Sequence, residues 1–148
     1  MLINIISVLC WGAIVEISNN LLPENKFDIS AVNSLMGLPD EEVIPILPEL
    51  LTWIQDINWP IAIPMLSVLK KFEKHLQPYI LNILQPEETD DVWKYWIISK
   101  LLPLFSNEKL KVYKKSIERI SKYPTHGEKK EEVDIVATSF LAQSYFNS

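Results

Sequence analysis

Apolar residues recur at intervals of three and four along most of the chain from Asp28 onward, which is the spacing of one face of a helix. The clearest case is residues 107–122, where charged side chains separate the members of an apolar stripe. These members are Leu110, Tyr113, Ile117 and Ile120. No stretch alternates apolar and polar residues convincingly enough to predict a strand. The pattern therefore predicts an all-α protein.

About seven helices are expected, joined by short turns. Their approximate ranges are 28–36, 39–56, 59–72, 77–85, 90–105, 107–122 and 125–145. Asp28 or Ser30 suits the first N-cap, and Thr89 or Asp90 suits the fifth. Thr125 and Glu128 have the spacing of a capping box. Pro48 should kink the second helix or move its true start further along the chain.

The later helices are expected to form antiparallel hairpins, 59–72 with 77–85 and 90–105 with 107–122. Trp59 and Trp93 lie near the starts of these two hairpins, 34 residues apart. A period in the thirties with proline early in the helices is typical of HEAT-like repeats. We therefore predict a short HEAT-like α-α superhelix; an irregular helical bundle is the alternative.

The stretch "TWIQDINWPIAIPML" is interpreted as the corner between two packed helices. Asp56 and Asn58 are suited to bond nearby backbone N–H groups in a turn. Pro60 lies near the start of the next helix, where its missing N–H costs little. Trp53 and Trp59 supply apolar area on either side of the turn. A ligand site is the less favoured interpretation.

Trp93 and Trp96 are grouped with this corner as structural residues. They belong to the range 90–105, which is apolar nearly all round and is therefore expected to be a central, buried helix. An enzyme site near Asp56, Trp59 and Trp93 is a minority alternative, which a deep pocket with a perturbed carboxylate would support.

Three stretches carry a family resemblance: "KFDISAVNSLMGLPDEEVIPILPELLTWIQDINWPIAIPML", "DDVWKYWII" and "PTHGEKKEEVD". They resemble the bacterial family described as domain of unknown function 5071, small all-helical proteins with HEAT-like repeats. The resemblance covers about residues 21–148. It implies the fold but no activity, so it assigns no catalytic residue.

At 148 residues, the chain is expected to contain a single helical-repeat domain over 21–148. Residues 1–20 are mainly apolar, with no charge before Glu16, and are expected to be an extension that packs on the domain as a helix. A membrane or signal segment is the minority interpretation, because the run is too short to span a bilayer. The lone Cys10 suits a reducing compartment, so a cytoplasmic location is predicted.

Candidate chemistry is sparse. The two histidines, His75 and His126, have no metal-ligand spacing, and the three glycines form no phosphate-binding loop. Asp90 and Asp91 are better explained by helix capping than by acid–base catalysis. No catalytic residue, metal or cofactor is therefore predicted, and an enzyme is not expected.

Charge is unevenly distributed along the chain. Residues 21–66 hold seven acidic side chains against Lys26 alone, whereas residues 67–148 hold thirteen basic and eleven acidic ones. Candidate partner-binding residues follow from this: the acidic Glu41, Glu42 and Glu49, and a basic ridge of Lys111, Lys115, Arg119 and Lys122. An ordinary solvated helix face is the alternative for the ridge.

The predicted function is a non-catalytic protein–protein interaction module that binds on its concave or acidic face. A narrower version is an immunity protein that neutralises a basic toxin. Nucleic acid is an unlikely partner for a chain of net charge −5. The membrane is a partner only if residues 1–20 act as an anchor.

Overall fold

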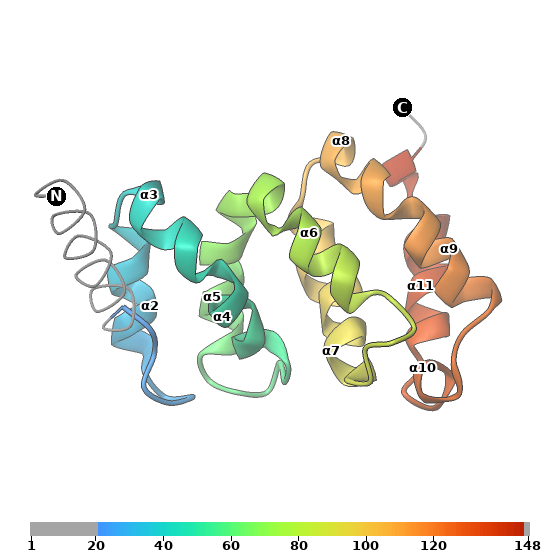
Figure 1. The fold of residues 1–148 in the computed structure, drawn as a ribbon, viewed down its shortest axis with the longest axis horizontal. Helices are drawn as coiled ribbons and strands as arrows, with labels where there is room; N and C mark the ends of the chain where they lie inside the picture. Colours follow the sequence, from blue (N-terminus) through green and yellow to red (C-terminus); the bar gives the residue numbers. More distant parts are fainter. Residues whose placement is uncertain (1–20, 147–148) are drawn as a thin grey trace, which may run out of the picture.

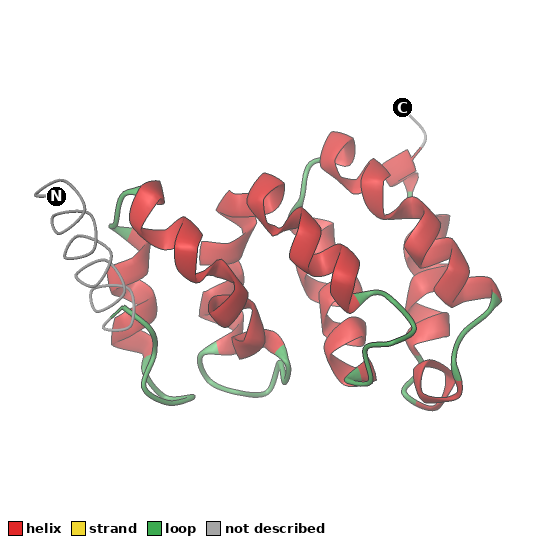
Figure 2. Cartoon of the chain, viewed as in Figure 1, coloured by secondary structure: helices red, strands yellow, loops and turns green. Residues whose placement is uncertain are grey.

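The computed structural model describes residues 21–146, and every regular element in that range is a helix or a helical turn (Figure 2). The prediction of an all-α fold is confirmed. Ten α-helices are present in this part of the chain: α2 Ile29–Met36, α3 Asp40–Val43, α4 Leu47–Leu51, α5 Ala62–Leu69, α6 Glu73–Ile83, α7 Asp91–Trp96, α8 Asn107–Leu110, α9 Lys114–Lys122, α10 His126–Lys130 and α11 Val133–Ala142.

Tight helical turns combine several of these pieces into longer helical segments. Helices α3 and α4 are joined by the 3-10 turn Ile44–Ile46, and α8 and α9 by Lys111–Tyr113. The 3-10 turn Lys70–Phe72 links α5 to α6. If α3–α4, α8–α9 and α10–α11 are each counted as one segment and α5 and α6 separately, the described residues contain seven main helical segments, which match the seven predicted ranges.

The helices lie in two layers (Figure 1). A back layer contains α2, α5, α7 and α11, in which α2 packs on α5 and α7 packs on α11. A front layer contains α4, α6 and α9, in which α4 packs on α6. Successive helical segments alternate between the layers as hairpins, which is the arrangement of a HEAT-like repeat stack. The predicted architecture is confirmed.

Side-chain caps fix where α2 and α7 begin. Asp28 accepts from the Ala31 N–H at 3.2 Å, and Asp90 accepts from the Trp93 N–H at 3.0 Å. These contacts settle both choices between neighbouring cap residues. The pKa of Asp28 is lowered, chiefly because its carboxylate also accepts from the Glu24 N–H.

Proline accompanies the break between α3 and α4, whereas the 3-10 turns Lys70–Phe72 and Lys111–Tyr113 contain none. The expected effect of Pro48 is seen, because α3 ends at Val43 and α4 begins only at Leu47, with Pro48 in its first turn. The fourth helix differs from expectation. Pro78 lies inside α6, which begins at Glu73 rather than near residue 77. The earlier start is favoured because it buries Leu76, which has no exposed surface.

A π-helical turn, Ile97–Leu101, follows α7 directly. The Leu102 N–H donates to the Ile97 carbonyl oxygen, five residues earlier, in place of the usual four. Pro103 accounts for the widening, because it has no N–H and its ring crowds the carbonyl four residues before it. The 3-10 turn Leu102–Leu104 then ends the segment.

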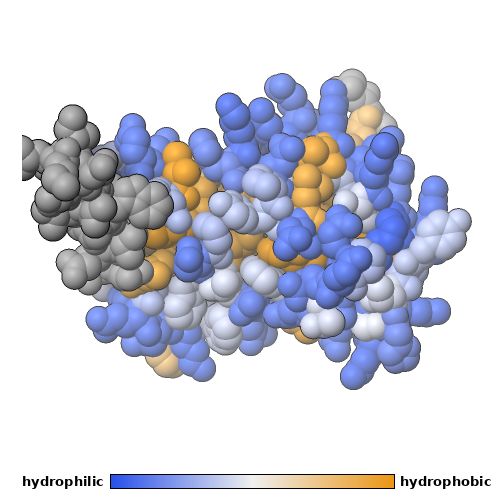
Figure 3. Space-filling model, in the orientation of Figure 1, coloured by the Kyte–Doolittle hydropathy of each residue, from blue (hydrophilic) through white to orange (hydrophobic). Residues whose placement is uncertain are grey.

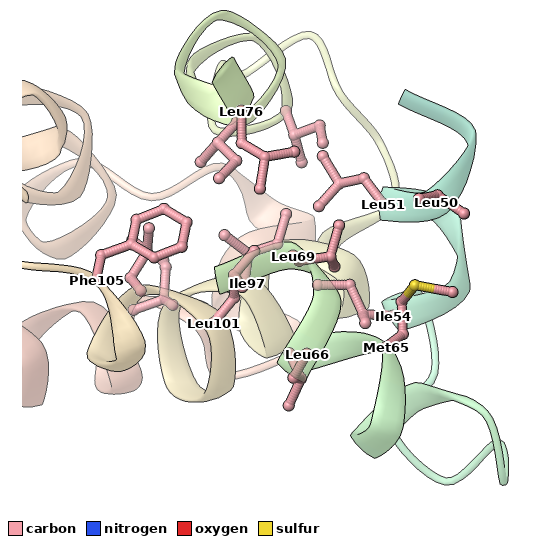
Figure 4. Packing of buried hydrophobic residues seen from close by; sticks show 14 of the residues in the cluster. Leu50, Leu51, Ile54, Met65, Leu66, Leu69, Leu76, Ile97, Leu101 and Phe105 are labelled. Atoms are coloured by element: carbon pink, nitrogen blue, oxygen red, sulfur yellow. The ribbon is translucent and has the colours of Figure 1, made fainter. Parts of the chain in front are cut away.

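The core is continuous between the two layers. Leucine and isoleucine side chains of α4, α5 and α6 meet those of the segment that starts with α7 (Figure 4). Buried members of this cluster include Leu50, Leu51, Ile54, Met65, Leu69, Leu76, Ile97 and Leu101. Each such side chain stabilises the fold by roughly 1.5–3 kcal/mol relative to exposure. The stack therefore depends on apolar burial shared between neighbouring hairpins.

Tyr113 is the largest side chain that is completely buried, and its hydroxyl has no hydrogen-bond partner in the described residues. Burial raises the pKa of this hydroxyl, and the Glu73 carboxylate adds to the rise. The folded state therefore favours the neutral phenol. The stability that this neutral phenol contributes is lost as the pH rises above about 10, where Tyr113 of the unfolded chain ionises.

Replacing Tyr113 with Phe should raise the free energy of unfolding by roughly 1 kcal/mol, because it removes a buried hydroxyl without a partner. It should also reduce the loss of stability above about pH 10. Urea unfolding at neutral and alkaline pH measures both effects. Tyr123→Phe is the control, since Tyr123 is 77% exposed and should change neither. A destabilised Tyr113→Phe protein would show that the hydroxyl is satisfied.

Candidate functional site

Two charged side chains are completely buried among the described residues, Lys94 and Glu128. The Lys94 Nζ atom donates to Glu128 Oε1 at 3.1 Å, which joins α7 to α10. Lys94 also lies 3.1 Å from the Asp91 carboxylate, one turn earlier on its own helix. Burying a lone charge would cost several kcal/mol, so these contacts are needed for the helices to pack.

Arg119 extends the cluster to α9. Its Nη1 atom donates to both Glu128 oxygens at 2.8 Å, and its Nη2 atom donates to the Leu84 carbonyl oxygen at 2.8 Å. Leu84 is the residue that ends α6. The buried Glu128 carboxylate therefore binds two cations, Lys94 and Arg119. These contacts connect α6, α7, α9 and α10. We call Asp91, Lys94, Arg119 and Glu128 the ionic cluster.

A glycine allows the close packing around this cluster. A Cβ atom added to Gly127 would collide with the Asp91 Oδ2 atom. The absence of a side chain at Gly127 therefore lets α10 approach the first turn of α7. This approach brings Glu128, the next residue, within reach of Lys94.

The sequence pattern locates this cluster only in part. Thr125 accepts from the Glu128 N–H at 3.1 Å, so half of the predicted capping box forms. The Glu128 carboxylate binds Lys94 and Arg119 instead of closing the box. The missed signal is Lys94 itself, which with Lys100 is one of two lysines in the range 90–105, a helix that is otherwise apolar nearly all round.

The predicted basic ridge is split by the structure. Lys111, Lys115 and Lys122 are exposed, whereas the Arg119 side chain is 26% exposed and turned toward Glu128. Lys115 and Arg119 line a groove of about 240 Å³, with Ser116 of α9 and residues 84–86 after α6. Arg119 thus joins the ionic cluster to the surface.

The predicted acidic residues lie at the other end of the front layer. Glu41 and Glu42 are exposed on α3, and Glu49 is exposed on α4. The structure records no ion pair for any of the three within residues 21–146. Their carboxylates face solvent beside the apolar core residues of the same helices.

The residues of the expected corner lie between α4 and α5. The Asp56 carboxylate accepts from the Asn58 N–H at 2.9 Å, and the Asp56 carbonyl oxygen accepts from the Trp59 N–H at 3.1 Å. The Trp53 and Trp59 rings meet edge to face, 6.0 Å apart. Pro60 stands two residues before α5 begins.

Trp93 and Trp96 are both on α7 but have different surroundings. The Trp93 Nε1 atom donates to the Leu51 carbonyl oxygen at 3.2 Å, which ties α7 to α4. The Trp96 Nε1 atom is buried without a hydrogen-bond partner in the described residues. Trp93 therefore has a structural role, and Trp96 is left with a polar group to satisfy.

A family model described as Domain of unknown function (DUF5071) matches residues 21–141. The chain belongs to this family. The match covers the two-layer stack from before α2 to α11 and includes every member of the ionic cluster. No curated protein matches the chain. The family description assigns no activity, so the function of this DUF5071 chain is inferred from its own residues.

Two further observations concern the described part of this DUF5071 chain. Between residues 21 and 146, no three His, Cys, Asp or Glu side chains are grouped so as to hold a metal ion. No helix in that range combines the length and apolar character needed to cross a membrane. The predicted roles of residues 1–20, as a packed helix or an anchor, fall outside the described residues.

Removing one member of the ionic cluster should destabilise the DUF5071 domain strongly. Lys94→Met leaves Glu128 buried with one cation fewer and should lower the free energy of unfolding by roughly 3–5 kcal/mol. Glu128→Gln should have a similar effect, and the double substitution should cost less than the sum of the two. Denaturant unfolding of the three variants measures this, with the exposed Lys122→Met as control. A Lys94→Met protein as stable as the wild type would contradict the cluster's role.

Gly127→Ala should lower the free energy of unfolding by roughly 1–3 kcal/mol, because its methyl group would displace Asp91. Gly37→Ala is a matched control, since its added Cβ would only meet the Ser34 carbonyl oxygen at 3.8 Å. Thermal unfolding of both variants compares them directly. Equal melting temperatures for the two would show that α10 can move away from α7 at little cost.

Proposed function

We propose that this chain is a protein-binding module without catalytic activity of its own, which docks a partner protein along its front layer. The observation that carries the proposal is the charge polarity of this layer. Its α3–α4 end exposes acidic side chains, and its α8–α9 end exposes lysines. A repeat stack is suited to such docking because it presents an extended surface supported by rigid hairpins.

The acidic end has few neutralising charges of its own. Asp40, Glu41, Glu42 and Glu49 are exposed there, and the segment from residue 21 to 66 contains Lys26 as its sole lysine or arginine. The face seen in Figure 3 is largely hydrophilic, with apolar surface showing between the helices. A partner with a basic patch would gain attraction at this end and specificity from the lysines at the other.

The opposite end of the layer is basic but mixed. Lys111, Lys114, Lys115 and Lys122 are exposed along α9 and the turn before it, together with Glu108 at the start of α8. A partner surface that is basic at one end and acidic at the other would therefore dock in one direction. The reverse orientation would place like charges together, which costs several kcal/mol.

A cytoplasmic location is part of the proposal. It is supported by the single cysteine of the sequence, which suits a reducing compartment. A partner from the same compartment is therefore the one to seek. A toxin neutralised by this chain would be a narrower case of the same docking.

The proposal is tested by capturing partners from lysate with the full chain as bait. A front-layer variant with Glu41, Glu42 and Glu49 each changed to Lys should lose a stoichiometric partner that the wild type retains. A control with Glu24 and Glu87 each changed to Lys makes charge changes of the same kind at exposed positions outside α3–α4 and outside α8–α9. It should retain the partner. The retained amount should also fall as salt rises, because the contact charges are screened.

Two results would count against the proposal. One is the absence of any stoichiometric partner after crosslinking of the full chain in lysate. The other is equal retention by the wild type, the front-layer variant and the control, which would place the contact away from the acidic end. Identification of the retained protein decides whether it is a toxin.

A further inference from the structure

A second surface feature lies outside the front layer, where α7 meets the junction of α10 and α11. It is a groove of about 230 Å³ lined by Val92, Tyr95, Trp96, Glu131 and Glu132. Sites for drug-sized molecules occupy about 300–1,000 Å³, so this groove is suited to a single side chain. We call it the Trp96 groove.

Its aromatic side is built from two consecutive residues of α7. The Tyr95 and Trp96 rings meet edge to face at 4.9 Å with an angle of 87° between their planes. The face of an aromatic ring attracts cations, most strongly in tryptophan. The Trp96 Nε1 atom is a donor that the described residues leave without an acceptor. Because this Nε1 atom is buried, a ligand in the groove meets the aromatic rings and not the N–H. A ligand that suits this side therefore has a cationic group.

Its acidic side is formed by Glu131 and Glu132, both of which are exposed. Glu132 has a left-handed backbone (φ 60°), the sole non-glycine residue of the described chain with a positive φ. No ion pair is recorded for either carboxylate within residues 21–146. Lys129 and Lys130 precede them on α10 but do not line the groove. Two carboxylates thus border an aromatic surface.

We propose that the Trp96 groove binds an arginine side chain of a partner protein. The guanidinium group stacks on the aromatic side and donates to the Glu131 and Glu132 carboxylates. The recognition of a partner rests on the proposed function, whereas the affinity of the groove for an arginine group does not.

Arginine fits this chemistry better than lysine. Its planar guanidinium stacks on aromatic rings and offers five N–H donors in a fixed fork, which two carboxylates accept. It is also less strongly hydrated than an ammonium group, so it loses less solvation in a groove that is partly apolar. A lysine would meet one carboxylate as a point charge and leave the ring faces less covered.

The test uses N-acetyl-L-arginine N-methylamide as the probe and the full chain labelled with ¹⁵N. The Trp96 indole N–H resonance, assigned with Trp96→Phe, should shift in a saturable way, with a dissociation constant on the order of 1 mM. The citrulline analogue has the same shape without the charge, and it should bind at least tenfold more weakly. The lysine analogue should also bind more weakly than the arginine probe.

Variants locate the binding. Glu131→Gln with Glu132→Gln should weaken binding of the arginine probe at least tenfold, and both positions are exposed, so the fold is expected to persist. Glu24→Gln with Glu108→Gln removes the same charge from exposed positions outside the groove and outside the acidic end, and should leave binding of the probe unchanged. An unmoved Trp96 resonance at about 100 mM probe overturns the proposal, since a built site binds near 1 mM. Equal binding of the citrulline or lysine analogue also overturns it.

The two proposals fail separately. If the arginine probe binds but no partner is captured from lysate, the arginine site is supported and the interaction module is rejected. If a partner is captured through the front layer while the probe leaves the Trp96 resonance unchanged, the interaction module is supported and the arginine site is rejected. Capture repeated with the Glu131→Gln, Glu132→Gln variant shows whether the partner uses both surfaces.

Discussion

The buried carboxylate of Glu128 is the interaction on which the second half of the stack depends. It neutralises Lys94 from α7 and Arg119 from α9, and Arg119 in turn binds the carbonyl group that ends α6. Burial of leucine and isoleucine side chains is non-directional. The hydrogen bonds and ion pairs of the cluster need specific distances and angles, so they help to set the relative positions of the helices.

This dependence relates the two candidate binding surfaces. Arg119 reaches the surface at the groove beside Lys115, and α10, which carries Glu128, leads directly into Glu131 and Glu132. The front layer and the Trp96 groove are therefore attached to the same buried group. The ionic cluster therefore supports both surfaces.

The sequence predicts the architecture well because helical spacing is repeated over the whole described range. Residues 107–122 form their helix with Leu110, Tyr113, Ile117 and Ile120 buried, as their spacing indicates. The ionic cluster is harder to foresee, because Lys94 and Glu128 are 34 residues apart and each has a plausible local role. Arg119 has the spacing of an exposed ridge, and only the tertiary fold turns it inward. The Trp96 groove likewise needs the left-handed turn at Glu132, which no local pattern marks.

The π-helical turn has a consequence for how this chain can change over evolution. A π-turn takes in one residue more than an α-turn but still advances the helix by about one full rotation, so the helix keeps its facing on either side of the turn. Tyr95 and Trp96 can therefore line the groove at the α10–α11 junction while Leu101 and Leu102 lie in the core. Deleting one residue from Ile97–Leu101 would restore ordinary helix with little rotation of the two flanking parts. A length change of one residue should therefore be tolerated at this turn, as well as in the loops between hairpins.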